Sequence, residues 1–423
     1  MKNTKKGFTL VELLVVIAIL AILATVAVVG YTSFTKKANI SNDTVIAKEL
    51  TTLIQATDIN DSVEDFNDVI DVLHANGFVL ANLNTKTEGC FFVWDSKENQ
   101  ILLVDANDGF KVIFPEGEYT PNSNWHLAVC DAATCEKFLA NDTIKNANVQ
   151  IVPVVTEIKD LASILASAGI EEVYIDESLT VLDDSSAVVN LNLGATKVSS
   201  PILSSVPFVV NNGTLSIVGG EITAAGELLD ADGDIQHIAI TGNDGTLNIT
   251  DTKIIGQKNM PINYAGADGT MKNVTSTGAS WGAMGAFDGS QVTLDGCTFD
   301  AEEATIWLSS NGTESSEVTR ITVNGGTYTA KKDTVAVYEY YHSGAKGTAE
   351  VVINNGTFSA ENGKVFHCMA AESGRSKIYV YGGTFQDKAF VANDETFKSH
   401  LQDLTTVGTV TWNAELQCYI IQK

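Results

Sequence analysis

The chain has 423 residues, with 26 basic side chains against 52 acidic ones and a formal net charge of -26. At roughly 150 residues per domain, this length accommodates two or three domains. A hydrophobic content of 44% with only 18% charged residues excludes a disordered chain. A surface this acidic repels the phosphate backbone of nucleic acids, and nucleic-acid binding is therefore not expected. The six cysteines are too few for a disulfide scaffold.

The first element is an apolar run over residues 8–29, interrupted by a single charge at Glu12. At about 1.5 Å per residue, a helix of this length spans roughly 33 Å and can cross a bilayer. Lysines precede the run, which predicts that everything after Gly30 is exported. A cleaved secretory signal is the alternative, but the run is longer than usual and lacks a small-residue cleavage site. The apolar pattern continues as an amphipathic stripe, so we expect one helix over residues 8–57, transmembrane at 8–29.

The segment from Lys5 to Glu12 reads Lys-Lys-Gly-Phe-Thr-Leu-Val-Glu, and it closely resembles the prepilin processing site of type IV pilins and pseudopilins. The resemblance implies that residues 1–7 are a leader and that prepilin peptidase cuts between Gly7 and Phe8. It also implies that the new Phe8 amine is methylated and pairs with Glu12 of a neighbouring subunit. A lone carboxylate in hydrocarbon is costly unless it is paired or protonated. The alternative is a carboxyl near the interface that reaches out to water.

Residues 58–155 have a mixed pattern. Apolar residues at helical spacing from Val63 to Leu73 predict a short helix. Two apolar runs at 91–94 and 101–104, joined by a polar connection, predict a β-hairpin. We therefore expect a small α+β segment that is similar to the head of a pilin.

Self-similar segments rich in Val, Ile, Thr, Asn and Gly begin after residue 156 and recur at intervals of about 30 residues. The clearest copies lie at residues 292–299, 321–328, 351–358 and 378–385. One copy cannot bury its apolar side alone, so the copies must stack. The pattern predicts a right-handed parallel β-helix over residues 156–400, capped at its first edge by a helix at 157–168.

The turns of these copies carry Asp295, Asn324 and Asn355 at positions predicted to be equivalent, where Asn and Asp side chains can stack as ladders. A β-sandwich of hairpins is the competing fold, but the copies recur at the length of one rung. Residues 401–423 resemble the earlier hairpin and predict a second one. The fold class is therefore mixed, with a transmembrane helix, a small α+β head and a mainly-β solenoid.

The repeats resemble the pectin-lyase-like β-helix family of surface proteins, adhesins and polysaccharide-active enzymes. Such enzymes need a basic residue beside clustered carboxylates, or carboxylates that converge from adjacent rungs. Arg320 and Arg375 are predicted in loops without an acidic cluster beside them. The acidic side chains in neighbouring rungs are interpreted as solvated surface, and they are Glu302, Glu303, Asp333 and Glu339. No catalytic residue, metal site or cofactor is expected, and an enzyme is the less favoured interpretation.

Strand alternation directs Trp307, Tyr338 and His367 outward on successive rungs, and Trp281 extends the row. An exposed aromatic row on a flat β-face is suited to binding sugar rings. The other interpretation is that these side chains lie under a long loop or against the pilin-like head. Both remain open from the sequence.

Together these patterns predict a minor pilin or pseudopilin that displays an adhesive or recognition head outside the cell. The alternative is a filament-borne or membrane-anchored polysaccharide lyase or hydrolase. The expected partners are prepilin peptidase, other pilin subunits, the cytoplasmic membrane and a surface glycan or protein, without nucleic acid. Before assembly we expect a single-pass membrane protein, and after assembly a pilus or cell-surface protein.

Overall fold

The computed structural model describes residues 10–58, 63, 65–129, 132–166, 170–175, 179–181, 186–200, 206–224, 227–229, 235–256, 260–309, 316–338, 346–369, 375–386, 401–402, 409–415 and 418–422. The chain forms two compact units. The first contains residues 1–66, 83–127 and 146–150, and the second contains residues 67–82, 128–145 and 151–423.

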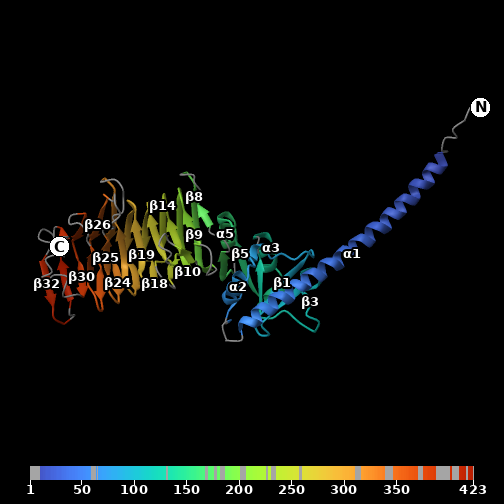
Figure 1. Cartoon of the computed structure of the whole chain (residues 1–423), viewed down its shortest axis with the longest axis horizontal. Helices are drawn as coiled ribbons and strands as arrows, with labels where there is room; N and C mark the ends of the chain where they lie inside the picture. Colours follow the sequence, from blue (N-terminus) through green and yellow to red (C-terminus); the bar gives the residue numbers. More distant parts are fainter. Residues whose placement is uncertain are drawn as a thin grey trace, which may run out of the picture. The chain divides into compact units, whose positions relative to one another are not determined.

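The first unit is built on one long helix, α1 (Leu10–Asp58), which Figure 1 shows in blue. The continuous helix agrees with the amphipathic stripe in the sequence. Its last turns pack on an antiparallel sheet ordered β3-β2-β1-β4. The strands are β1 (Cys90–Asp95), β2 (Gln100–Asp105), β3 (Lys111–Phe114) and β4 (Trp125–Val129), with the 3-10 helix η2 (Ala106–Asp108) between β2 and β3.

Packing of α1 on this sheet uses one face of the helix. Ala47, Leu50 and Ile54 are fully buried, whereas Val45 is 60% exposed. Thr51 Oγ1 accepts a hydrogen bond of 2.9 Å from the backbone N–H of Ile101. In the described part of the chain, no helix is both long enough and apolar enough to cross a membrane.

A buried carboxylate ties α1 to the segment before β1. Asp43 is fully buried and accepts hydrogen bonds from Lys86 N at 2.8 Å, Thr87 N at 2.9 Å and Thr87 Oγ1 at 2.6 Å. Asn39 adds a bond from its side-chain amide to the carbonyl of Lys86. A buried carboxylate is tolerated only when such donors satisfy it, so this cluster fixes where the segment meets the helix.

Short helices and strands open the second unit. They are α2 (Phe66–Ala75), η1 (Leu80–Asn82), α3 (Ala132–Leu139), α4 (Asp142–Ala147), β5 (Gln150–Val155), α5 (Ile158–Leu165) and β6 (Glu172–Ile175). The helix α5 packs against β7 and β8, the first strands of the solenoid. It buries Leu161 and Ile164 there.

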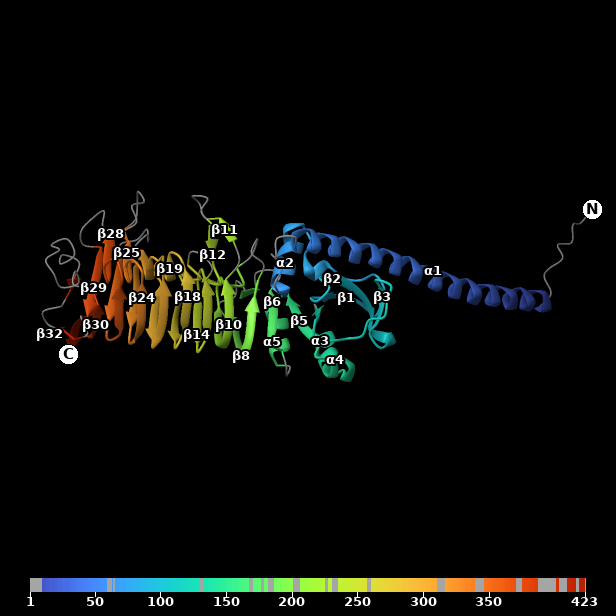
Figure 2. The ribbon, with the colours of Figure 1, turned by 90° about the horizontal axis from the view of Figure 1, so that it is seen from below.

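The rest of the second unit is a parallel β-solenoid, whose strands follow one another in colour order in Figure 1 and lie side by side in Figure 2. Each turn contributes one strand to each of three parallel ladders. The first ladder contains β8 (Val188–Ser199), β10 (Thr214–Ala224), β14 (Thr246–Thr250), β17 (Asp268–Lys272), β20 (Gln291–Asp295), β23 (Val318–Val323), β26 (Thr348–Ile353), β29 (Ser376–Val380) and β31 (Leu401–Gln402).

The second ladder starts from β6 and the ends of β8 and β10. It continues through β15 (Lys253–Gly256), β18 (Thr275–Ala279), β21 (Cys297–Ala301), β24 (Gly326–Ala330), β27 (Thr357–Ala360) and β30 (Gly383–Gln386).

The third ladder has eight strands within the described residues. They are β7 (Leu179–Val181), β9 (Phe208–Val210), β13 (Ile240–Gly242), β16 (Ile262–Ala265), β19 (Gly282–Phe287), β22 (Ala304–Ser309), β25 (Val335–Tyr338) and β28 (Phe366–Met369). The predicted parallel β-helix is therefore confirmed as a parallel β-solenoid of about eight turns.

Two antiparallel hairpins accompany the stack within the part of the chain that the structure describes. One joins β11 (Glu227–Leu229) to β12 (Ile235–His237). The other joins β32 (Thr409–Asn413) to β33 (Cys418–Gln422), and β33 also pairs antiparallel with β30. The second hairpin thus occupies one edge of β30, where it limits further strand pairing.

A stack of aromatic rings fills the solenoid core behind the second ladder. Phe299, Tyr328, Phe358 and Phe385 pair on successive strands, and all are at most 1% exposed. Ring centroids are 4.8 Å apart between Tyr328 and Phe358 and 5.3 Å apart between Phe358 and Phe385. The threonine before each ring points outward because strand side chains alternate.

Glycine precedes that threonine in the later copies because the turn leaves no room for a side chain. Gly326 has φ +111, and a Cβ there would lie 2.1 Å from the carbonyl oxygen of Cys297 on the preceding rung. The repeated Gly-Thr-aromatic sequence therefore records a close backbone approach, an outward hydroxyl and an inward ring.

The polar turns stack as predicted, with one difference in register. Asn354 Nδ2 donates to Asn324 Oδ1 at 2.8 Å, and the backbone N–H of Asn324 bonds to Leu294 O. The residue equivalent to Asn324 is therefore Asn354, and the prediction of Asn355 was wrong by one residue. Asp251 and Asn273, which stack at an earlier turn, both adopt the left-handed conformation with φ +52.

Candidate functional site

The third ladder carries the predicted aromatic row, and we call its outward surface from β19 to β28, together with Trp281, the aromatic face. Alternation along β22 buries Ile306 and Leu308 completely and leaves Trp307 partly exposed. Trp281 lies just before β19, and its ring stacks on that of Trp307, with centroids 6.5 Å apart and planes 19° apart. The two tryptophans therefore form one continuous platform across neighbouring rungs.

Strand register places the remaining predicted residues in two different rows of the third ladder. Trp307 pairs with Gly285 on one side and Ala336 on the other, and Ala336 pairs with His367. Tyr338 belongs to the second row because it pairs with Ser309. The side chain of Tyr338 lies outside the described residues.

The side chains of Met260 and Phe287 pack closely around Gly285, which pairs with Trp307 across the ladder. A Cβ at Gly285 would lie 2.6 Å from the ring of Phe287 and 2.8 Å from Met260 Sδ. In the second row, Ser309 is fully buried, and its hydroxyl has no hydrogen-bond partner in the described structure. This end of the aromatic face is therefore packed. Toward the other end, the strand register places Ala336 between Trp307 and His367.

A carboxylate holds His367 in place. Asp333 Oδ2 lies 2.5 Å from His367 Nδ1, and Asp333 Oδ1 accepts a 2.8 Å hydrogen bond from Lys364 N. Burial alone would raise the pKa of Asp333, but the hydrogen bonds from His367 and Lys364 outweigh it, so this pKa lies below its usual value. Asp333 was predicted to be solvated surface, and its side chain is in fact only 19% exposed.

The lowered pKa of Asp333 predicts a pH-dependent contribution to stability. A carboxylate with a depressed folded pKa stabilises the fold above its unfolded pKa of about 3.9, and this contribution disappears as pH falls through the folded pKa. Asp333→Asn is expected to lower the free energy of unfolding by about 1 kcal/mol at pH 7 and to have little effect in strong acid. Urea unfolding across pH 2.5–7 measures this, with the exposed Asp300→Asn as the control. A pH-independent cost for Asp333→Asn would contradict it.

Ion pairs line the turn between the second and third ladders. Glu302 bonds to Lys331 at 2.6 Å, and Glu303 bonds to Lys332 at 2.5 Å. All four side chains are at least 38% exposed, so each pair contributes little to stability. The surface assignment of Glu302 and Glu303 fits this exposure, while Glu339 lies outside the described residues.

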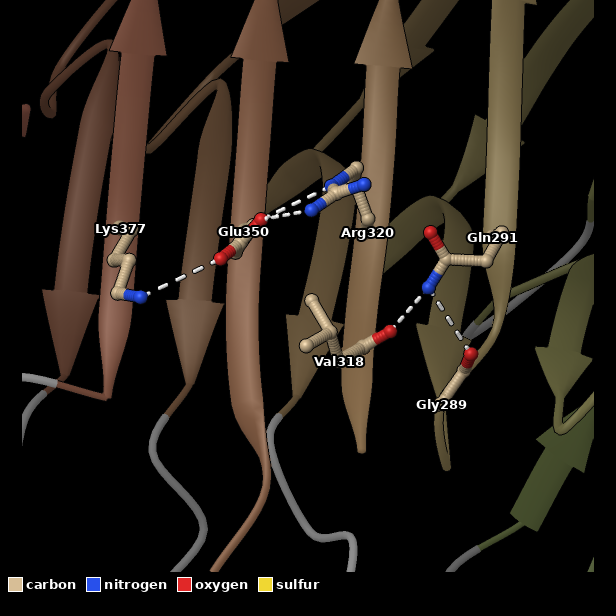
Figure 3. A network of polar contacts seen from close by, with 6 residues as sticks. All are labelled: Gly289, Gln291, Val318, Arg320, Glu350 and Lys377. Carbon is tan, nitrogen blue, oxygen red and sulfur yellow. Dashed lines mark hydrogen bonds and ion pairs between the residues drawn. The ribbon is translucent and has the colours of Figure 1, made fainter. Parts of the chain in front are cut away.

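The first ladder holds a second charged group, drawn in Figure 3. Glu350 Oε2 accepts hydrogen bonds from Arg320 Nε at 3.0 Å and Arg320 Nη2 at 2.5 Å, and Glu350 Oε1 lies 3.5 Å from Lys377 Nζ. The prediction that Arg320 sits in a loop without an acidic neighbour was wrong, because Arg320 lies within β23 and pairs in register with Glu350. Because Arg320 and Glu350 are a full rung apart in the sequence, their contact could not be predicted from it.

The geometry of this charged group favours a structural role. The Glu350 side chain is only 9% exposed and is engaged by two cations on the flanking strands. Both carboxylate oxygens are therefore occupied by partners within the ladder. Within the described residues, no group of three or more His, Cys, Asp or Glu side chains could hold a metal ion.

The cysteines whose side chains are described lie in the interior of the two units. Cys90, Cys135 and Cys297 are buried, and Cys90 and Cys297 are free thiols. Burial raises the pKa of Cys297 to about 11, so its thiol stays protonated and packs as a small apolar group. Cys130 lies outside the described residues.

The predicted processing site, Gly7 and Phe8, lies outside the described residues. Glu12 falls in the first turn of α1, although its side chain is not among those described. The helix beyond it keeps apolar side chains exposed, and these are Leu14, Val15, Val16, Ile17, Tyr31, Phe34 and Val45. Exposed apolar side chains of this number on one helix indicate a surface that contacts another apolar partner.

Comparison with known families identifies the N-terminal segment. Residues 2–28 match the model of the prokaryotic N-terminal methylation motif. No curated protein and no solved structure matches the chain in the same comparisons. The motif, together with the β-solenoid, identifies the architecture as a prepilin-type N-terminus that carries a β-solenoid head.

The motif also indicates how the N-terminal segment is processed and used. It implies processing by prepilin peptidase and assembly with other pilin subunits, and it indicates a membrane-anchored or pilus-surface protein. A prepilin-type motif of this kind is typical of a structural pilin subunit rather than of an enzyme.

Proposed function

We propose that this chain is a minor pilin or pseudopilin whose β-solenoid head recognises a surface glycan or protein outside the cell. The matched motif at residues 2–28 carries this proposal. In it, residues 1–7 are the leader, residues 8–57 form the pilin helix with its membrane span at 8–29, and Glu12 pairs with a neighbouring amine. Residues 58–155 are the α+β segment, 156–400 a right-handed solenoid and 401–423 its closing hairpin.

The recognition role of the head is supported by the aromatic face. Trp281 and Trp307 stack while remaining partly exposed, which is the arrangement that amphipathic aromatic side chains take in binding surfaces. A large head also suits a sparsely incorporated or tip subunit, because subunits crowd near the axis of a filament. The net charge of -26 argues against a nucleic-acid partner.

The processing step gives a direct test of the subunit role. When the chain is expressed with a prepilin peptidase, we expect the mature protein to start at Phe8 and to carry one methyl group on its amine. Intact-mass analysis and N-terminal sequencing measure both. Gly7→Trp is expected to block cleavage, because a bulky side chain replaces the one residue without a Cβ. A mature protein that retains residues 1–7 would contradict the proposal.

The enzyme alternative has its own test on the same sample. The processed protein is not expected to cleave polysaccharides. The carboxylate of Glu350 is engaged by Arg320 and Lys377, and that of Asp333 is engaged by His367. Reducing-end release and ultraviolet absorbance of unsaturated products report hydrolase and lyase activity. Release that is lost in Asp333→Asn or Glu350→Gln would favour the enzyme.

A further inference from the structure

Trp307 and His367 lie two rungs apart along the solenoid axis on the aromatic face. In the outward row, only Ala336 lies between them, and the three residues belong to β22, β25 and β28. Parallel strands are about 4.8 Å apart, so the two larger side chains start roughly 10 Å apart along the axis. A linear ligand that follows the axis meets an indole first and an imidazole two rungs later.

The two ends of this interval offer different chemistry. Trp307 is already part of a stacked platform with Trp281, and the face of an indole attracts the polarised C–H groups on one side of a sugar ring. His367 is held by Asp333, so its other ring nitrogen has a fixed direction. An apolar ring face followed by an oriented polar group matches a chain of sugar rings that carry hydroxyls at their edges.

Charges beside the row indicate which sugars fit. Lys331 and Lys332 lie in the adjoining turn, and Glu302 and Glu303 engage them within 2.6 Å. Asp333 has His367 as its hydrogen-bond partner. Because these cations are already paired and the whole chain is strongly acidic, an acidic polysaccharide would be repelled.

We propose that the aromatic face binds a neutral polysaccharide whose chain runs along the solenoid axis, with one sugar ring stacked on Trp307 and a following ring hydrogen-bonded by His367. This inference rests on the proposed recognition function and narrows it to one class of ligand. Trp307 is the principal contact, Trp281 supports its ring, and Asp333 is a positioning residue that acts through His367.

Affinity electrophoresis of the processed full-length protein in mild detergent tests this inference. The gels contain galactomannan or hydroxyethylcellulose as neutral polymers, or polygalacturonate as the acidic one. We expect retardation in at least one neutral gel and none in polygalacturonate. Trp307→Ala is expected to weaken the neutral interaction at least tenfold, while Trp307→Phe, which keeps a stacking ring, restores part of it.

Matched variants separate binding from folding. Tyr379→Ala removes an aromatic side chain from the outward surface of β29 in the first ladder, and we expect it to bind as the parent does. Thermal unfolding of each variant shows whether Trp307→Ala retains its fold. His367→Ala and Asp333→Asn should weaken binding together, since one acts through the other.

The outcomes distinguish this inference from the proposed function. Retardation by polygalacturonate alone, or equal retardation in both kinds of gel, overturns the neutral class and leaves recognition by the head intact. Neutral retardation that survives in folded Trp307→Ala overturns the location. Absence of retardation in every gel overturns the ligand class, and the processing and assembly experiments then still decide whether the chain is a pilin subunit.

Discussion

Replacing Phe358 with alanine is expected to lower the free energy of unfolding of the solenoid by about 3–5 kcal/mol. The ring is completely buried, and it contacts the rings of Tyr328, Phe385 and Phe366 at centroid distances of 4.8, 5.3 and 6.4 Å. The cavity cannot collapse easily, because hydrogen-bonded ladders fix the backbone on both sides. The ring contacts of Phe358 are therefore not replaced by new ones.

The neighbouring Thr357 provides the control for this substitution. Its side chain is exposed on the outer surface of β27, so Thr357→Ala is expected to change stability by no more than about 0.5 kcal/mol. Guanidinium unfolding followed by near-ultraviolet circular dichroism compares the two variants with the parent. Hydrogen exchange should show the largest loss of protection on the strands paired with β27, because stability in a solenoid depends on neighbouring repeats. Equal costs for the two variants would contradict the role assigned to the stack.

The sequence was sufficient to predict the solenoid because each copy repeats its own local physics. The Gly-Thr-aromatic signature places a tight turn, an outward side chain and a core ring in three consecutive residues, as at Gly356, Thr357 and Phe358. The resemblance at residues 5–12 also depends only on adjacent residues. Features of this kind can be predicted without knowing which residues contact one another in the folded chain.

Register between rungs could not be predicted, since the length of a rung is not constant. Stacked turn residues are 22 apart for Asp251 and Asn273, 30 apart for Asn324 and Asn354 and 32 apart for Asn211 and Asn243. A fixed period therefore misplaces contacts by a residue or two. For this reason the sequence predicts Asn355 instead of Asn354 as the turn residue, predicts Tyr338 in the row of Trp307, and does not reveal the partner of Arg320.

Buried polar contacts across long stretches of chain were also beyond the sequence. Asp43 lies in a helix whose pattern gives no sign that its carboxylate is buried, and its partners follow 43 and 44 residues later. Its role depends on where the segment before β1 crosses α1. Only the folded structure brings those donors together.

Changing Glu12 to alanine is expected to abolish filament incorporation while leaving cleavage at Gly7 intact. Glu12 is the only charge in an apolar segment at residues 8–29, and the matched motif implies assembly with other subunits through this end of the chain. A carboxylate there is costly unless a cation neutralises it, and the terminal amine of a neighbouring subunit would do so in the assembled state. The charge then favours the filament over the separate subunit, whereas alanine removes that preference.

Immunoblots of sheared filaments and of the membrane fraction measure the distribution of each variant. We expect Glu12→Ala to be processed normally and to reduce the filament fraction at least tenfold, which corresponds to about 1.4 kcal/mol of lost association free energy per subunit. Glu12→Gln should behave like the alanine variant, because an amide keeps the shape and loses the charge. The exposed Glu49→Ala on the same helix is the matched control and should assemble as the parent does. If Glu12→Gln assembled normally, the carboxylate would not be the group that joins one subunit to the next.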